Sequence, residues 1–158
     1  MIGDLQIELA DLADATLIAD MSRSEIEYGL PWGWTTSRVM KLMRDEAANV
    51  AVVRRSGGFA GFGIMKYGEE RAHLLLFAVH AAHRRAGVGS ALLTWLEEVA
   101  RVAGISITTA EARLDNANGI AFYRRHGYLQ IGTVAKMYNG EMDGVKLQKR
   151  FYVDQALT

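Results

Sequence analysis

The chain has 158 residues and is half hydrophobic, which is the size and composition of one domain (residues 1–158) with its own core. Its 18 basic residues balance its 18 acidic ones, which argues against nucleic-acid binding, and no stretch approaches the ~20 apolar residues of a membrane helix. The absence of cysteine excludes disulfides, thiolate nucleophiles and Cys-bound zinc and, with no secretory signal at the N-terminus, fits a cytoplasmic protein.

The first half of the chain predicts, in order, a strand, two helices and three further strands separated by turns. Weak alternation marks the first strand, polar cap residues at positions 35–37 open the second helix, and apolar runs mark the later strands. The expected elements are Leu5–Leu9, a helical run over 11–28, a helix that contains Val39, Leu42 and Met43, and strands at Asn49–Arg55, Phe59–Tyr67 and Arg71–Val79.

After Val79 the hydrophobic period changes from two to 3.6, which predicts a helix over about Gly87–Ala103 that ends at Gly104. A strand at Ile105–Ala112, a short helix at 116–126 and a closing hairpin of 128–138 and 144–152 complete the chain. The order predicts a mixed α/β domain. Its sheet of about seven strands is mostly antiparallel, contains one parallel β-α-β crossover and is flanked by about four helices.

The turn from Arg84 to Ser90 has the composition of an anion-binding site. Gly87 and Gly89 let the backbone approach a phosphate, the first N–H groups of the following helix have no helical partner, and two arginines add positive charge. A glycine-rich turn can also serve only to reverse the chain. A Rossmann fingerprint needs a third glycine where this chain has Leu92, and a P-loop needs a lysine that is missing here.

The string Arg84-x-x-Gly87-x-Gly89 resembles the acyl-CoA-binding motif R/Q-x-x-G-x-G/A of the GNAT superfamily of N-acetyltransferases. Residues 115–128 resemble a later motif of that superfamily, N-x-x-A-x-x-x-Y-x-x-x-G-F, through Asn116 and Tyr123. Gly119 replaces the alanine of this motif and costs the helix about 1 kcal/mol relative to Ala. The resemblance implies a GNAT-like fold that transfers the acetyl group of acetyl-CoA to a primary amine by direct attack in a ternary complex.

The resemblance also implies how the coenzyme is held. The strand at Phe77, Ala78 and Val79 splays from its neighbour and binds the pantetheine arm as an added strand would, with the Val79 N–H polarising the thioester carbonyl. Asn116 hydrogen-bonds the pantetheine, although an Asp-Asn pair is also a good helix cap. The pyrophosphate falls to the loop residues, namely Arg84, Arg85, Gly87, Val88, Gly89 and Ser90. No metal is expected, because His80-x-x-His83 lacks a third ligand.

Tyr123 matches the general acid of the superfamily. A phenol with a reference pKa of ~10 stays protonated at pH 7 and can protonate a departing thiolate. The alternative is a helix tyrosine that only packs in the core. Glu111 lies twelve positions earlier, as the base does in the ribosomal-protein alanine acetyltransferase branch, whose L-E-V-R-x-S-N stretch resembles residues 110–116.

The position of Glu111 in its predicted strand also favours it as the general base, independently of the resemblance. Strand parity places it on the apolar face of Ile105 and Ile107, where a carboxylate is costly unless it is used or paired. The structural alternative is an ion pair with Arg113, two residues further on. His80, beside the end of a strand and titratable near neutrality, is the second candidate base.

Three aromatic residues are candidates for the acceptor site. Trp32 and Trp34 lie in a loop that borders the acceptor groove in this fold, and they either sort acceptors or fill the core. Tyr138 belongs to a segment that loosely resembles the Y-Y…E-D segment of the same branch. Glu25 and Glu27 would attract a cationic amine or simply face solvent.

The identity of the acceptor stays open at the level of sequence. The branch resemblance favours a peptide or protein α-amine, and a polyamine, an amino acid or an antibiotic amine remain alternatives. A non-catalytic acyl-CoA-binding module is the alternative to an enzyme. Dimers are common in the superfamily, so a homodimer is also left open.

Overall fold

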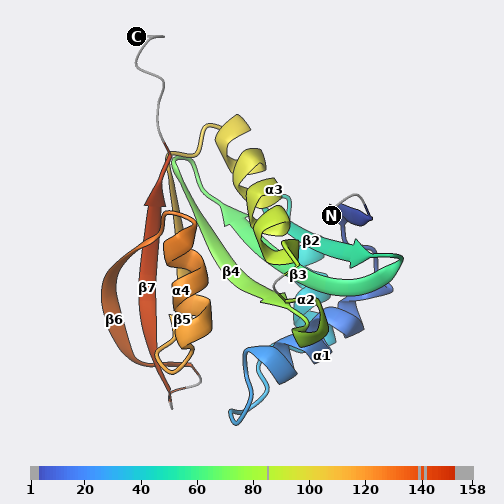
Figure 1. The fold of residues 1–158 in the computed structure, drawn as a ribbon, viewed down its shortest axis with the longest axis horizontal. Helices are drawn as coiled ribbons and strands as arrows, with labels where there is room; N and C mark the ends of the chain where they lie inside the picture. Colours follow the sequence, from blue (N-terminus) through green and yellow to red (C-terminus); the bar gives the residue numbers. More distant parts are fainter. Residues whose placement is uncertain (1–3, 85, 139, 141, 152–158) are drawn as a thin grey trace.

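The computed structural model describes residues 4–84, 86–138, 140 and 142–151. Within these residues the chain forms the predicted succession of strands and helices (Figure 1). The strands are β1 (Leu5–Leu9), β2 (Ala48–Arg55), β3 (Gly58–Tyr67), β4 (Arg71–Val79), β5 (Ile107–Arg113), β6 (Leu129–Tyr138) and β7 (Met142–Arg150). The helices are α1 (Asp14–Glu25), α2 (Thr36–Met43), α3 (Val88–Val102) and α4 (Ala117–Arg125), with one 3₁₀ turn, η1 (Ala81–His83).

The strands form one sheet of seven in the order β1-β2-β3-β4-β5-β7-β6. Every neighbouring pair is antiparallel except β4 and β5, which α3 connects as a parallel crossover. β7 lies between β5 and β6, so the closing hairpin joins the sheet through its second strand. This mixed α/β sheet, with its helices on both faces, confirms the predicted fold class.

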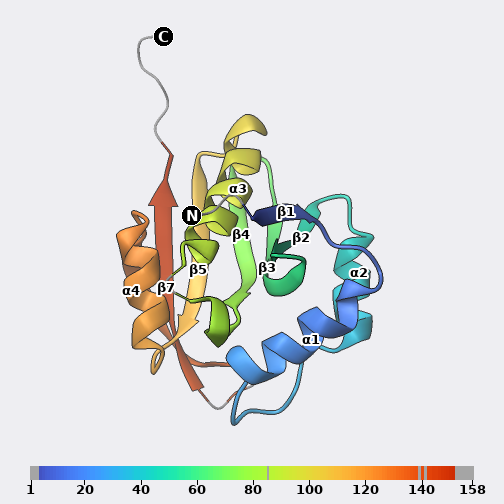
Figure 2. The ribbon, with the colours of Figure 1, turned by 45° about the vertical axis from the view of Figure 1, so that its right-hand side comes forward.

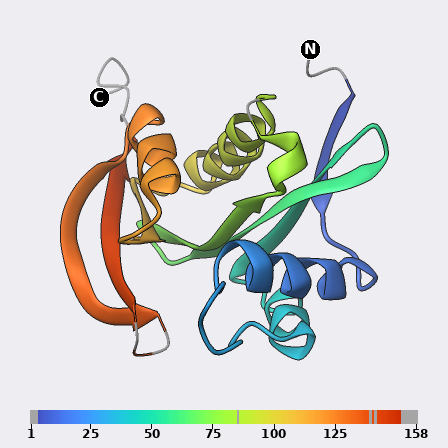
Figure 3. The same cartoon turned by 60° about the horizontal axis from the view of Figure 1, so that its bottom comes forward.

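The helices cover opposite faces of the sheet. α3 and α4 lie on one face, and α1 and α2 lie on the other (Figure 3). On the α3/α4 face Leu92, Leu93 and Leu96 are fully buried, and on the α1/α2 face Ile18 and Val39 are. Each such side chain stabilises the fold by ~1.5–3 kcal/mol relative to an exposed one, so two separate apolar layers hold the sheet.

Several element boundaries differ from the predicted ones by a few residues, and two of the differences have clear local reasons. α1 starts at Asp14 rather than Asp11, because the Asp11 carboxylate accepts the Ala13 N–H (3.0 Å) in a competing turn. β5 starts at Ile107 because Ile105 still belongs to the end of α3. The Ile105 N–H donates to Ala100 O and the Gly104 N–H to Arg101 O, which is a Schellman motif with Gly104 at φ +89°.

β4 and β5 separate towards their C-terminal ends, and this opening positions the site. Their pairing runs only from Arg71–Ile107 to Leu74–Ala110, after which the strands diverge (Figure 1). At the same point β4 contains a bulge, since Ile64 of β3 lies opposite Leu76 and Met65 lies opposite Leu74. Figure 2 shows the C-terminal end of α1 beside the open ends of the two strands.

Candidate functional site

The unpaired end of β4 offers its backbone to the opening. The bulge leaves Leu75 and Leu76 both packed towards α1 and α2, so Phe77 and Val79 turn to the α3/α4 face. The His80 N–H donates to Ala60 O of the β3 side (2.8 Å). Because backbone groups alternate along a strand, the N–H and C=O of Val79 point the other way, into the opening. An extended ligand can therefore pair with this edge, as the sequence predicts for pantetheine.

The turn before α3 has the geometry of an anion site. Gly87 is the N-cap of α3 in the left-handed region (φ +77°), where a side chain is strained. The Ala91 N–H makes a helical bond to Gly87 O, which leaves the amides of residues 88–90 at the open helix start. A Cβ on Gly89 would lie 3.1 Å from the Phe122 ring, so glycine allows α4 to pack closely here.

Of the two arginines in the turn before α3, the structure describes the contacts of Arg84. Arg85 lies outside the described residues. Arg84 donates to the Glu25 carboxylate at the end of α1 and, through Nε, to Val79 O (3.3 Å). Arg84 therefore links the loop to the end of α1 and to the end of β4. Glu25 is already ion-paired, so its negative charge is not open to an amine in this arrangement.

Asn116 caps α4 as the sequence allows. Its Oδ1 accepts the Gly119 N–H (2.9 Å). A Cβ at position 119 would lie only 2.5 Å from Asn116 Nδ2, so an alanine there would displace the capping side chain. The glycine that departs from the superfamily motif thus has a packing reason in this chain.

Tyr123 lies on the face of the opening that α3 and α4 cover. Its side chain is buried (6% exposed), and its ring lies 6.3 Å from the ring of Phe77, 5.6 Å from that of Phe122 and 5.4 Å from that of Tyr128. The aromatic cluster holds the Tyr123 ring beside Phe77 of β4. This position is compatible with both readings of Tyr123, a general acid and a core aromatic.

Glu111 lies on the opposite face, and its partner is not the predicted one. Its neighbours Ala110 and Ala112 pack towards α3, so the Glu111 side chain points towards α1. His73 Nε2 of β4 lies 2.8 Å from Glu111 Oε1. This hydrogen bond lowers the pKa of the Glu111 carboxyl, partial burial opposes the shift, and Lys146 on β7 adds a smaller lowering. His73 is thus a residue of the site that sequence reasoning missed.

The ion pair with Arg113, the alternative role left open for Glu111, is not the one that the structure shows. The Arg113 guanidinium instead donates to both carboxylate oxygens of Asp115 (3.0 Å each). The parity argument also needs a correction, because Ile105 precedes β5 and packs into the α3 cluster. Glu111 and Arg113 lie two residues apart on the same face of β5, but each contacts a different partner outside this strand. Glu111 contacts His73 of β4, and Arg113 contacts Asp115 in the connection to α4.

His80 and Ser90 have roles that only the structure shows. The exposed His80 caps η1, since its Nδ1 accepts the Ala82 N–H (3.1 Å). His126 at the end of α4 donates from Nδ1 to Phe122 O (2.8 Å), and its Nε2 lies 2.9 Å from Ser90 Oγ in the first turn of α3. The Phe122 carbonyl can only accept, so in the neutral ring Nε2 accepts the Ser90 hydroxyl proton. His126 therefore orients a predicted phosphate-binding hydroxyl.

Two of the three candidate acceptor residues, Trp32 and Trp34, lie in the connection between α1 and α2. Trp34 is half-buried under the Arg38 guanidinium (3.8 Å), whereas Trp32 is 40% exposed beneath Arg23 (5.1 Å). Glu27 does not face solvent as expected, because its buried carboxylate accepts the N–H groups of Gly33 and Trp34. The backbone of Tyr138 ends β6, and its side chain lies outside the described residues.

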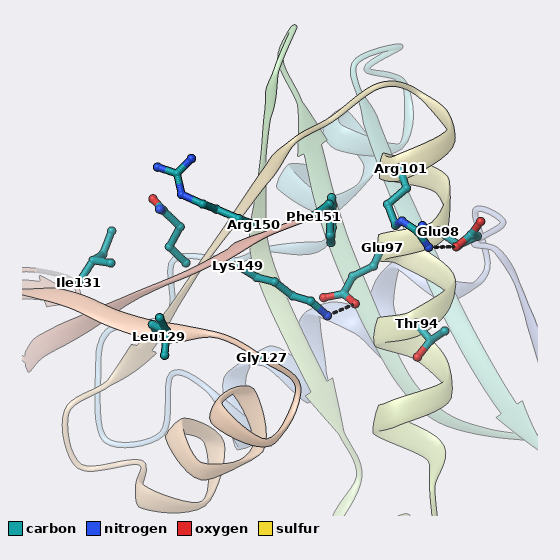
Figure 4. A pocket seen from close by; sticks show the side chains of 11 residues that line it. Thr94, Glu97, Glu98, Arg101, Gly127, Leu129, Ile131, Lys149, Arg150 and Phe151 are labelled. Atoms are coloured by element: carbon teal, nitrogen blue, oxygen red, sulfur yellow. Dashed lines mark hydrogen bonds and ion pairs between the residues drawn. The ribbon is translucent and has the colours of Figure 1, made fainter. Parts of the chain in front are cut away.

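A hollow of about 850 Å³ lies away from these residues, between α3 and the β6–β7 hairpin (Figure 4). It is lined by apolar Leu129, Ile131 and Phe151 and by the Glu97–Lys149 ion pair (2.9 Å). None of the predicted site residues borders it. Over the part of the chain that the structure describes, no group of His, Asp and Glu could hold a metal, and no helix has the length and apolarity to cross a membrane.

Solved structures with the same fold include three informative relatives. Ard1 from Thermoplasma volcanium has a TM-score of 0.84 and 25% identity, over 95% of this chain and 99% of that one. The ribosomal-protein-S18-alanine N-acetyltransferase from Escherichia coli has a TM-score of 0.77 and 21% identity, over 96% and 97%. YncA from Salmonella typhimurium, solved with its cofactor acetyl-CoA, has a TM-score of 0.75 and 19% identity, over 97% of each chain.

Comparison of the sequence with protein families establishes the family to which the chain belongs. No curated protein sequence matches the chain. The model of the acetyltransferase (GNAT) family, however, matches residues 15–128, from α1 to Tyr128, just before β6. This range contains the opening between β4 and β5, the anion site at α3 and the two catalytic candidates. The chain belongs to the acetyltransferase (GNAT) family and uses acetyl-CoA as its acetyl donor.

Proposed function

We propose that the protein transfers the acetyl group directly from acetyl-CoA to a primary amine, with both substrates bound at once. The observation that carries the proposal is the opening between β4 and β5. It has an unpaired strand edge for an extended donor, a tyrosine on one face and a carboxylate on the other. Reactants that meet from two faces need no covalent intermediate on the protein.

In the proposed reaction one proton is removed on the α1 side of the sheet and another is supplied on the α4 side. The amine approaches from the α1 side, and as its nitrogen bonds to the acetyl carbon, Glu111 takes the proton that the nitrogen loses. The hydrogen bond from His73 lowers the pKa of Glu111, so the carboxylate is ionised and able to accept at neutral pH. The Val79 N–H donates to the carbonyl oxygen as negative charge grows there. The C–S bond breaks towards α4, where Tyr123 protonates the departing thiolate.

The acceptor that we favour is the α-amine of a peptide or protein. The support is the similarity of the Ala110–Asn116 stretch to the ribosomal-protein alanine acetyltransferase branch, together with the shared fold of the Escherichia coli enzyme that is named for such a substrate. The aromatic side chains between α1 and α2 would border this amine. The outcome of an acceptor screen decides between this class and small amines.

A thiol-release screen tests the proposal. The wild-type protein is incubated with acetyl-CoA and a panel of short peptides, polyamines, amino acids and antibiotic amines, and free thiol is measured. We expect release with at least one peptide. Tyr123→Phe and Glu111→Gln should each lower kcat on the order of 10²-fold, with acetyl-CoA affinity nearly unchanged, because only proton transfer is removed.

Two variants far from the opening serve as matched controls. Tyr67→Phe removes the hydroxyl that accepts from Asn49, and Glu98→Gln removes one exposed ion pair with Arg101. Both should keep the wild-type kcat. An unchanged kcat for Tyr123→Phe would refute its role as the acid. Acetyl-CoA binding without thiol release from any amine would point instead to a non-catalytic acyl-CoA-binding module.

A further inference from the structure

Arg113 ends β5 two residues after Glu111, on the same face of the strand. The residue is only 5% exposed, and a guanidinium cannot lose its charge at ordinary pH. A buried guanidinium must therefore satisfy its donors inside the protein. Which groups it contacts shows what the fold uses it for.

Two of the nitrogens of Arg113 hold the start of α4. Nε and Nη2 donate to the two carboxylate oxygens of Asp115, each at 3.0 Å. Asp115 immediately precedes Asn116, the N-cap of α4. This planar two-point contact fixes the orientation of the guanidinium group.

The remaining nitrogen reaches into the connection between α1 and α2, which we call the acceptor loop (residues 26–35). Nη1 donates to Tyr28 O (2.6 Å) and to Ile26 O (3.1 Å). The Tyr28 ring lies over the guanidinium, with Cζ 3.7 Å from the ring centroid. A lysine could supply neither the fork nor the flat face, so these contacts require arginine.

Glu27, between the two pinned carbonyls, holds the other end of the acceptor loop. Its carboxylate accepts the N–H groups of Gly33 (2.7 Å) and Trp34 (3.1 Å) and the Ser22 hydroxyl (3.0 Å). The loop is thus tied to β5 by Arg113 and closed on itself by Glu27. Its exposed rings are Tyr28 at 41% and Trp32 at 40%.

We infer that Arg113 is a positioning residue of the acceptor site, which places the Tyr28 ring as the wall of the acceptor groove beside Glu111. This inference rests on the proposed function, in which the amine reaches Glu111 from the α1 side. Residues i and i+2 of a strand lie on the same face about 7 Å apart, so the Tyr28 ring stacked on Arg113 lies on the same side of the sheet as Glu111. The ring would contact the carbon atoms next to that amine.

The experiment compares Arg113→Lys with Arg101→Lys, a matched control in which the arginine is exposed and, among the described residues, forms an ion pair with Glu98 alone. The acceptor probe is a short peptide with a free N-terminal alanine. We expect Arg113→Lys to raise the KM for this peptide about tenfold or more, since a misplaced groove wall weakens acceptor binding. The Kd for acetyl-CoA, measured by calorimetry, should stay within about twofold of the wild-type value. Arg101→Lys should change neither quantity.

Further variants separate positioning from general loss of structure. Tyr28→Ala should raise the peptide KM in the same way and Tyr28→Phe should raise it less, because phenylalanine keeps the ring. Asp115→Asn should raise it less than Arg113→Lys, because Nη1 keeps its two carbonyls. If Tyr28→Ala leaves the peptide KM unchanged, or if Arg113→Lys weakens acetyl-CoA and peptide equally, the inference is wrong.

Hydrogen exchange gives a readout that does not depend on turnover. In Arg113→Lys the amides of Leu30, Gly33 and Trp34, all bonded to Glu27, should exchange faster than in the wild type. Unchanged exchange there would refute the positioning of the acceptor loop. A wild-type protein that acetylates neither the peptide nor any amine would refute the proposed function, while the exchange result still decides this inference.

Discussion

Glu111 and His73 come from different strands, and the hydrogen bond between them determines how the carboxyl titrates. His73 is held on its other side as well, since its Nδ1 lies 2.6 Å from Thr109 Oγ1. The lowered pKa of Glu111 means that the folded state binds its proton more weakly than the unfolded chain does. This group therefore adds stability above its unfolded pKa, and the stability is lost as the pH falls through the folded pKa.

Replacing His73 tests this link. In His73→Ala the main cause of the lowered pKa is gone, while partial burial still raises it, so the pKa of Glu111 should rise. The acidic limb of the kcat/KM profile should then move to higher pH, and unfolding at low pH should begin at a higher pH. Tyr67→Phe, which removes a hydroxyl bonded to Asn49 and leaves His73 and Glu111 unchanged, is the control. An acidic limb that does not move in His73→Ala would show that Glu111 does not govern it.

At the scale of single elements, the end of β4 is the most consequential feature. A bulge at Leu75 rotates the last residues of the strand, and the loss of pairing after Leu74 exposes the side of the strand towards β5. Alternation along the strand then gives two sets of amides. Those of Phe77 and Val79 point into the opening, and those of Ala78 and His80 point towards β3, as the bond from His80 to Ala60 shows.

Amide exchange should distinguish these two sets. On addition of acetyl-CoA, the amides of Phe77 and Val79 should exchange at least about tenfold more slowly, because hydrogen-bonded strand amides are protected. The amides of Ala78 and His80 are already paired with β3 and should change much less. The measurement is hydrogen exchange by NMR with and without saturating acetyl-CoA. Equal slowing at all four amides would argue against added-strand binding.

At the scale of the whole molecule, the short β4–β5 pairing leaves the two halves of the sheet joined by few strand bonds. Side-chain links span the same divide, among them Arg113 to the carbonyls of Ile26 and Tyr28, His126 to Ser90, and Tyr128 to Glu97. The last is the most buried. Tyr128 is fully buried and donates to Glu97 (2.8 Å), which Lys149 also contacts. Burial and the nearby carboxylate raise the pKa of the Tyr128 hydroxyl.

Removal of this hydroxyl should destabilise the whole fold. Tyr128→Phe restores the residue that the superfamily motif has, but it leaves the partly buried Glu97 with Lys149 alone. We expect a loss of about 1–3 kcal/mol in the free energy of unfolding, measured by urea denaturation. Tyr67→Phe, whose hydroxyl is only half-buried, should cost less. A Tyr128→Phe variant as stable as the wild type would show that the pair of Glu97 and Lys149 suffices.

Much of the fold and of the donor site follows from the sequence by itself. Hydrophobic period and capping residues are local properties, so the order of strands and helices, the capping residues at positions 35–37 and the helix stop at Gly104 could all be predicted. The donor motif is equally local, because an anion site at a helix start needs only a strand, a glycine turn and the helix. Residues 84–90 therefore indicate an anion site from the sequence alone, and the resemblance of residues 84–89 and 115–128 to the superfamily motifs implies that the anion is the coenzyme.

Tertiary structure alone decided the partners of the charged groups and the face on which each residue lies. Strand parity cannot anticipate the bulge at Leu75, which places His73 on the α1 side and Phe77 on the α3 side of one strand. Nor can sequence distance rank His73, 38 positions away, above Arg113, two positions away, as the partner of Glu111. Such pairings are set by the register between β4 and β5 and by the packing of the acceptor loop against β5. That register and packing bring together groups that are remote along the chain.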